Sequence, residues 1–342
     1  MFGGKTDSGS YREKFKRMPE MWTRKRQMLL FGAIFISALG IWVSQNIVVR
    51  NLVLLMGYER TLDSYAQSDT TNTQITSHKD RGGREAGLIS AFFGLDNGLP
   101  QLFGLASCRG AGGMDGMPVI FTHEVDLTTL EPGDFKITTA SGQFGQIICL
   151  TMAPADDPGE QRTALLIGEF GSAQDQPVQV DIVGNVLSMD RLLNFRGAKI
   201  KVTPLESGPS LIWAEIVPQA NWALGRKATR LPWGGGDGCP TGTMQVVRVA
   251  WDGGVKKLDG TDADQAIGLM YKVQVTTSDE KTREVIPMAL ADLGDGDNNH
   301  ALCLDISDPA ISVRFPAGHL TDPRNDVNTD TMVLVTRTYE NR

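Results

Sequence analysis

The sequence lacks most of the short motifs by which enzymes and nucleic-acid-binding proteins are identified. It has no P-loop, no G-x-S-x-G, no glycine-rich dinucleotide fingerprint, no CxxC and no CxxCH. It has only four histidines, and its 40 acidic residues outnumber its 33 basic ones, which leaves a net charge of -7. Nucleic-acid binding normally needs a basic surface. We therefore expect no nucleic-acid partner, no cofactor and no enzymatic activity.

The composition is that of a folded protein rich in turns. Of the 342 residues, 41% are hydrophobic and 21% are charged, which excludes a disordered chain. The 38 glycines and 16 prolines follow no three-residue period, so collagen is excluded and a β protein with many turns is favoured. A chain of this length predicts about two domains.

A basic segment precedes the long apolar run of the sequence. Residues 1–27 hold eight basic and three acidic side chains, a net charge of +5, so the other 315 residues carry -12. The residues from Met28 to Val49 hold no charge. At about 1.5 Å per residue, a helix of that length reaches about 33 Å, enough to cross the hydrocarbon layer of a bilayer. We predict a transmembrane helix with its extension over residues 28–57.

The charges around this run predict its orientation. Basic flanks stay in the cytoplasm, so residues 1–27 are predicted to form a cytoplasmic tail. The rest of the chain would then lie on the periplasmic side of the inner membrane. Trp22 and Trp42 stand where interfacial tryptophans are typical, in contact with lipid or a partner. A cleaved signal peptide is the alternative, but residues 42–46 contain no small-residue cleavage pattern.

Residues 58–105 are predicted to join the anchor to the external part through a polar linker and then an apolar segment. The linker, at 67–87, is rich in small polar residues. The apolar segment, at 88–105, either packs beneath the β region that follows or docks on a partner subunit or the membrane surface. The candidate contact residues, on this segment and in a later tryptophan-rich stretch, are Phe92, Phe93, Leu95, Leu102, Phe103, Trp222 and Trp233.

From residue 118 onward the dominant pattern is an alternation of apolar and polar residues. A period of two marks strands with one buried and one wet face. No stretch with a clear helical period follows residue 110. The predicted fold is mainly β: one N-terminal transmembrane helix followed by two antiparallel β-sandwich-like units, the first β unit at 106–220 and the second β unit at 221–342. The alternation is clearest at 178–182, 199–203, 269–275 and 311–315.

A faint internal repeat supports two such units. Segments of the first unit match segments of the second, in the same order, at an offset of 133–138 residues. Each unit is predicted to close with an apolar strand, Leu211–Val217 in the first and Met332–Val335 in the second. The order of the matches, rather than any single match, indicates a duplicated sandwich. The matched segments of the first unit are 137–139, 164–167 and 177–182.

The four cysteines lie in the part of the chain that is predicted to be outside the membrane. An even number of cysteines in an oxidising compartment favours disulfides. Four cysteines allow three pairings, and the two-unit arrangement selects Cys108–Cys149 and Cys239–Cys303, one in each unit. Four buried thiols are the alternative. Each disulfide would add on the order of 3–4 kcal/mol of stability.

Candidate metal ligands are few and incomplete. His123-Glu124 begins like a zinc-protease motif, but Leu127 stands where the second histidine must be, so a helix-borne zinc site is excluded. Asp295, Asp297 and Asn299 offer oxygens at alternate positions, as calcium loops do, yet His300 occupies the place of the required glycine. These three residues are weak calcium candidates, and the acidic turn at 156–160 is their equivalent in the first unit. No metal is expected.

Ser188-Met189, in an anchored β protein, is similar to the nucleophile segment of type I signal peptidases. Gly296-Asp-Asn298 loosely resembles a Gly-Asp-Asn segment of the same family. The resemblance implies an anchored serine hydrolase. However, Asp190 follows Met189 where the family has a proline, and no lysine is placed to accept the serine proton. We keep the hydrolase as a remote alternative.

We therefore expect a non-enzymatic, single-span accessory subunit of a large membrane complex that braces partners on the periplasmic face. Its expected partners are other integral membrane subunits, the lipid bilayer and a basic soluble periplasmic protein attracted by the acidic external part. A basic tail with a tryptophan before one span is similar to the format of light-harvesting polypeptides, although this span has no histidine to bind a pigment. Photosynthetic and respiratory assemblies both fit. The alternative is a membrane-anchored envelope binding module for a glycan or a protein.

Overall fold

The computed structural model describes residues 68–101, 108, 110–227, 236–294 and 296–337, all of which belong to one body, Glu59–Arg342. In these ranges no helix has the length and apolar character of a membrane span. The predicted tail and transmembrane segment lie outside the described residues. So do the candidate residues Trp22, Trp42, Leu102, Phe103, Trp233 and Asp295.

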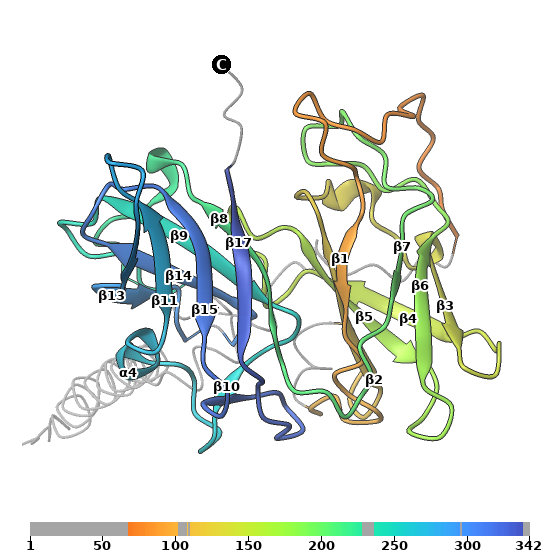
Figure 1. The fold of residues 1–342 in the computed structure, drawn as a ribbon. Coiled ribbons are helices and arrows are strands. Elements are labelled where there is room, and N and C mark those ends of the chain that lie inside the picture. Colours follow the sequence, from red (N-terminus) through yellow and green to blue (C-terminus); the bar gives the residue numbers. More distant parts are fainter. Residues whose placement is uncertain (1–67, 102–107, 109, 228–235, 295, 338–342) are drawn as a thin grey trace, which may run out of the picture. The chain divides into compact units, whose positions relative to one another are not determined.

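The regular structure of the described residues is almost all strand, and nearly all strand pairings are antiparallel, so the prediction of a mainly β fold is confirmed. Figure 1 shows the strands in two groups, β1–β7 and β8–β17. Its helical turns are short: η1 (Leu127–Thr129), η2 (Pro132–Asp134), η3 (Gln219–Asn221) and α4 (Gln265–Gly268).

The first β unit contains two sheets with the strand orders β1-β2-β5-β4 and β3-β6-β7. The apolar residues that alternate along the strands form a common buried cluster, in which the rings of Phe121 and Phe195 meet at 4.9 Å. Its strands are β1 (Leu88–Ala91), β2 (Asp115–Phe121), β3 (Phe135–Thr139), β4 (Gln146–Thr151), β5 (Thr163–Glu169), β6 (Pro177–Ile182) and β7 (Lys199–Lys201).

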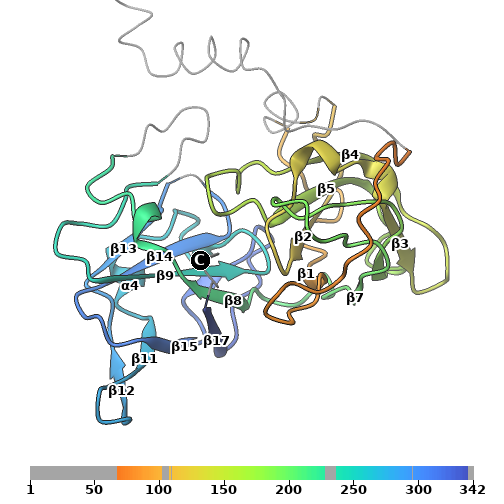
Figure 2. The same cartoon turned by 90° about the horizontal axis from the view of Figure 1, so that it is seen from above.

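The second β unit contains an eight-stranded sheet of order β12-β11-β15-β17-β8-β9-β14-β13 and the small pair β10-β16. Figure 2 shows the same strands from above. They are β8 (Leu211–Ile216), β9 (Gln245–Trp251), β10 (Lys256–Lys257), β11 (Lys272–Thr276), β12 (Thr282–Val285), β13 (Ala289–Ala291), β14 (Asn299–Leu304), β15 (Ala310–Phe315), β16 (Leu320–Thr321) and β17 (Thr331–Arg337).

The pairing order of the first unit recurs in the second. The order β1-β2-β5-β4 corresponds to β8-β9-β14-β13, and β3-β6-β7 corresponds to β11-β15-β17, with the strands in the same sequence order. In both units, a parallel pairing also joins the beginning of the unit to its end. Strand β17 pairs in parallel with β8, and in the first unit Phe92, next to β1, forms a parallel bridge with Thr203, beyond β7.

This correspondence corrects both limits of the first unit, which begins with β1, inside the predicted apolar segment, and ends before β8. The sequence predicts Leu211–Val217 as the closing strand of the first unit. Strand β8 instead pairs with β9 and β17, as the first strand of the second unit. The reason is that Leu211 and Ala214 are buried in the second core, among side chains that come from later in the chain.

A hydrogen-bonded chain of polar groups crosses the second core. Trp251 Nε1 donates to the hydroxyl oxygen of Tyr271 at 3.0 Å, and that hydroxyl lies 2.7 Å from His300 Nδ1. The tyrosine oxygen accepts from the indole, and its own O–H is then available to donate to the imidazole. Burial lowers the pKa of His300 to about 4, so the imidazole is neutral and can accept this proton.

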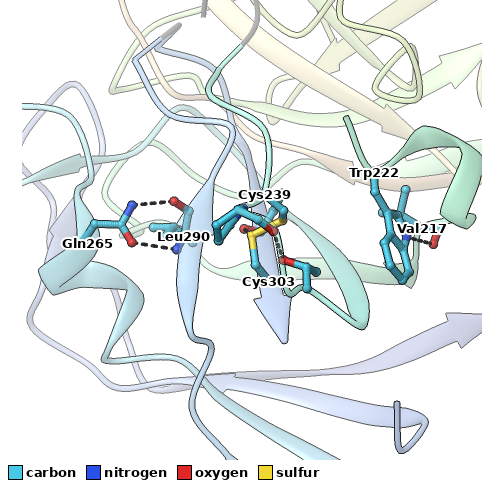
Figure 3. The surroundings of a disulfide bond; sticks show 9 residues. Val217, Trp222, Cys239, Gln265, Leu290 and Cys303 are labelled. Carbon is cyan, nitrogen blue, oxygen red and sulfur yellow. Dashed lines mark hydrogen bonds between the residues drawn. A yellow bond between two sulfur atoms is a disulfide. The ribbon is translucent and has the colours of Figure 1, made fainter. Parts of the chain in front are cut away.

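Both expected disulfides are present. Cys108 and Cys149 have Cα atoms 5.9 Å apart, and Cys239 and Cys303 are 5.7 Å apart. Each bond lies in its own small apolar cluster, separate from the main core of its unit. Figure 3 shows the second bond, with Trp222 in the same region.

Candidate functional site

Four of the residues predicted to contact a partner lie in the described ranges, and two of these four are buried within the chain itself. Phe93 is fully buried in the first core. Phe92 is also fully buried, against Gly253 of the second unit, where a Cβ would come within 2.7 Å of its ring. The docking prediction is therefore corrected for these two phenylalanines, because this part of the apolar segment packs against the chain's own β units.

Leu95 and Trp222 are half-buried. Leu95 lines an apolar cavity of about 140 Å³ together with Pro154 and Pro323. Trp222 donates its indole N–H to the carbonyl oxygen of Val217 at 2.8 Å and packs beside the Cys239–Cys303 bond. Both side chains therefore have structural contacts while part of their surface remains open.

The described loop residues considered for calcium form hydrogen bonds with each other. Asp297 accepts hydrogen bonds from both the backbone and the side-chain nitrogen of Asn299, each at 2.8 Å, and both residues are buried. His78, in the predicted linker, lies with Nδ1 2.7 Å from the carbonyl oxygen of Asn194. The described part of the linker is thus attached to the first unit.

The junction between the two β units is built around a buried arginine of the first unit. Arg162, next to β5, has its guanidinium 3.7 Å from the centre of the Trp213 ring on β8. Its Nη1 donates to the carbonyl oxygen of Thr122 at 3.1 Å, and Nη2 lies 3.7 Å from Glu215 on β8. This one side chain therefore joins the two units by a cation–π contact and an ion pair.

A second arginine crosses the junction in the opposite direction. Arg248, on β9, donates from Nη1 to the carbonyl oxygen of Gly159 at 2.5 Å. Its Nε lies 3.6 Å from Glu160, and Nη1 lies 3.9 Å from Glu215. Gly159 has φ +93°, and a Cβ there would come within 2.3 Å of the guanidinium, so only glycine fits.

The two acidic turns that the sequence shows in separate units meet at this junction. Burial, reinforced by the negative charges of Asp292 and Asp297, raises the pKa of Glu160 well above its ordinary value. Burial and the charge of Asp292 also raise the pKa of Asp157. Burial alone would lower the pKa of Arg248, but the surrounding carboxylates outweigh it and raise that pKa. Arg248 thus partly neutralises an acidic cluster shared by both units.

A polar cavity of about 350 Å³ adjoins the two arginines. In its wall, His123 Nε2 lies 3.2 Å from Asp80, which also accepts from Arg84 Nε at 2.8 Å. Burial opposes ionisation of Asp80, but the hydrogen bonds from Arg84 and His123 lower its pKa to about 2. Burial lowers the pKa of His123, so a neutral imidazole donates to this carboxylate. The charged and polar lining residues are Arg84, Thr122, His123, Glu124, Arg162, Ser188, Asp190, Glu215, Asn221 and Arg248.

Ser188 lines the same cavity but is not paired with the histidine. Its hydroxyl donates to Asp190 at 2.6 Å and accepts from the backbone N–H of Leu193 at 3.0 Å. His123 bonds to a different carboxylate, Asp80. The serine hydroxyl therefore shapes a turn, and its proton acceptor is a carboxylate rather than an imidazole.

Chemically, this arrangement can hold a polar group between paired arginines and carboxylates, and it can lock the two units together. Neither junction arginine is among the residues predicted from the sequence. Arg248 did leave a signal, since it interrupts the otherwise apolar run of β9, and a charge in a buried strand must be paired. Arg162 directly precedes β5 and interrupts no apolar run, so it gives no comparable signal.

Comparison with known proteins identifies no family. No family model and no curated protein matches the chain. Among solved structures, the N-terminal part of the bacterial S-layer protein SbsC is similar, with a TM-score of 0.24 and 12% identity over 73% of this chain and 44% of that one. A structure of domains 1–6 of surface layer protein SbsC has a TM-score of 0.24 and 11% identity over 68% and 42%. The chain spans less than half of either structure, and likenesses this low carry no argument about function.

Proposed function

We infer that the protein is a non-enzymatic, single-span structural subunit of a membrane complex. Residues 28–57 hold it in the inner membrane with the tail at 1–27 in the cytoplasm, and two sandwich-like β units brace partners on the periplasmic face. Other integral membrane subunits and the bilayer are its partners, and its acidic external part attracts basic soluble proteins.

The observation that carries this proposal is the buried junction between the units. A brace must transmit force without hinging, and domains within one chain move relative to each other unless their interface is well packed. Here Arg162 and Arg248 reach across in opposite directions, and Phe92 fills the space above Gly253. In the described residues, the charged groups of the junction interact with one another, as a structural role requires.

The two disulfides support the proposed orientation. Disulfides persist in oxidising compartments and are rare in the cytosol. The apolar run and its basic flank independently predict that the cysteine-bearing part lies outside the cytoplasm. Protease added to intact spheroplasts should therefore digest the part beyond residue 58. Complete protection of that part would contradict the topology.

The decisive experiment is native mass measurement of the full chain extracted in mild detergent. The proposal expects a stoichiometric complex with other membrane proteins. A matched control replaces residues 28–49 by an unrelated apolar span of equal length. If the native helix packs among partner spans, this control stays in the membrane but loses the complex. A wild-type monomer would contradict the proposal.

An envelope binding module is the second candidate, favoured by the 350 Å³ cavity with its three arginines. Three carboxylates line the same cavity, so its charges balance and it fits a polar glycan. Purified cell-wall sacculi should then retain the wild-type protein and release Arg84→Gln, whereas Arg283→Gln, on β12 away from the cavity, should bind like wild type. Equal retention of both variants would count against this candidate.

A further inference from the structure

Three carboxylates converge on one edge of the first β unit. Asp69 comes from the segment before β1, and Glu131 and Asp134 come from the turn before β3. Each of them offers an oxygen, and these oxygens all lie within 4.8 Å of one another. The cluster is separate from the junction and from the loop at 295–299 that the sequence suggested for calcium.

Asp134 is the unusual member of this cluster. Its side chain is fully buried, at 0% exposure. Oδ2 accepts the backbone N–H of Glu131 at 2.7 Å, but the buried Oδ1 has no hydrogen-bond partner. A buried carboxylate oxygen without a partner is costly. The oxygen lies against Gly184, where a Cβ would come within 1.9 Å of it, so the backbone leaves room for it.

The other two carboxylates are held in place by neighbouring groups. Asp69 Oδ2 accepts from the backbone and side-chain nitrogens of Asn185 at 3.2 and 3.0 Å. Glu131 accepts from the backbone N–H and the hydroxyl of Thr70 at 2.5 and 2.6 Å. A carboxylate has about four lone-pair sites, so these bonds leave capacity for a cation on every member.

The charge of the cluster is not balanced by a basic side chain. Within the described ranges, no lysine or arginine forms an ion pair with any of the three carboxylates. The close approach of the three carboxylates and the buried Oδ1 of Asp134 without a hydrogen-bond partner both favour a bound cation, and calcium is coordinated by carboxylate oxygens.

We propose that Asp69, Glu131 and Asp134 bind one calcium ion, which fastens the segment at residues 69–71 to the first β unit. Calcium prefers carboxylate oxygens in a flexible geometry, whereas magnesium requires a near-ideal octahedron. Asp69 is exposed, so water can complete the coordination shell. Extracellular calcium modules bind with dissociation constants of about 10⁻⁴–10⁻³ M, which we take as the expected range. The proposal is independent of the proposed membrane role.

The test is calorimetric titration of CaCl₂ into the full chain, purified in detergent and stripped with a chelator. Wild type should bind one additional calcium compared with Asp134→Asn, and its melting temperature should rise with calcium. Asp134→Asn should weaken binding at least tenfold. Asp181→Asn, a carboxylate change on β6 outside the cluster, should bind like wild type.

A second readout separates a cation site from a purely structural carboxylate. In chelator, Asp134→Asn should melt at or above the wild-type temperature, because the amide still accepts from Glu131 and removes the repulsion. In calcium the order should reverse. A variant that melts lower in both conditions would show a structural role and overturn the proposal.

The location of the ion is tested by hydrogen exchange. Calcium should slow exchange at the amides of Thr70 and Thr71, which donate to Glu131 and Asp69. The same amides should not respond in Asp134→Asn. An absence of calcium binding, or binding of magnesium but not calcium, would overturn the assignment.

Discussion

The guanidinium of Arg162 stacks on the ring of Trp213 at 3.7 Å, and the two residues belong to different β units. The exposed fractions of the Arg162 and Glu215 side chains are only 7% and 11%, so their ion pair is shielded from water. Arg162 thus connects the two cores through both its flat face and its charge. The stability of the junction should depend on this side chain.

Arg162→Ala should lower the free energy of unfolding by about 3 kcal/mol, the lower end of the range for breaking a buried ion pair. We expect the lower end because Glu215 still has Arg248 as a positively charged neighbour. Denaturant titration measures the loss. The matched control is Arg283→Ala, whose ion pair with Asp308 is exposed and should contribute at most about 1 kcal/mol. Equal losses in the two variants would mean that the junction is not stabilised by its arginine.

Tyr271→Phe should destabilise the second core by about 2 kcal/mol, because it leaves the Trp251 N–H and the His300 nitrogen buried without a partner. Thermal unfolding followed by near-ultraviolet circular dichroism reports the change. As a control, Thr261→Val removes an exposed hydroxyl that bonds Asp259, and it should cost less than about 1 kcal/mol. If Tyr271→Phe left the free energy of unfolding unchanged, the hydrogen bonds among Trp251, Tyr271 and His300 would not contribute to stability.

Asp252 should make stability depend on pH. Burial raises its pKa from 3.8 to about 7, so the folded protein holds a proton that the unfolded chain releases above pH 4. This carboxyl therefore costs nothing at low pH and destabilises increasingly from about pH 4 to pH 7. Asp252→Asn removes the titration. The free energy of unfolding of this variant, relative to wild type, should rise by on the order of 4 kcal/mol between pH 4 and pH 7. Denaturant titrations that gave parallel pH dependences for the two proteins would contradict this.

Loss of either disulfide should destabilise the external part to a similar extent. The bonds close loops with sequence separations of 41 and 64 residues. Loop-closure entropy then gives about 4 kcal/mol for each. Cys108→Ala with Cys149→Ala, and Cys239→Ala with Cys303→Ala, should each lower the melting temperature under oxidising conditions. With added reductant, the melting temperature of wild type should fall below that of either double variant under oxidising conditions. A wild-type melting temperature that does not respond to reductant would contradict the structural role.

Several strands could be predicted because their signal is local. The alternation at 178–182 corresponds to β6, and that at 311–315 corresponds to most of β15. The disulfide pairing also followed from chain order once two units were assumed. In contrast, residues 269–271 continue the alternation but precede β11, because Leu269 is the C-cap of α4 and Met270 and Tyr271 donate backbone hydrogen bonds back to Ile267 and Gly268.

The junction could not be predicted in the same way. Whether Phe92 contacts a partner or the chain's own second unit depends on Gly253, which lies far away in sequence. The unit to which β8 belongs likewise depends on β17, with which it pairs. An apolar residue indicates burial, but it does not indicate the surface that buries it.

The β content, the approximate repeat, the cysteine pairs and the expectation of a membrane anchor follow from the order of residues along the chain, because alternation, spacing and local charge are properties of neighbouring residues. The contacts of Arg162 with Trp213 and of Asp69 with Asp134 appear only in the folded protein. Those pairs are separated by 51 and 65 positions in the chain. Their contact arises from the packing of whole sheets, to which no short stretch of sequence is a guide.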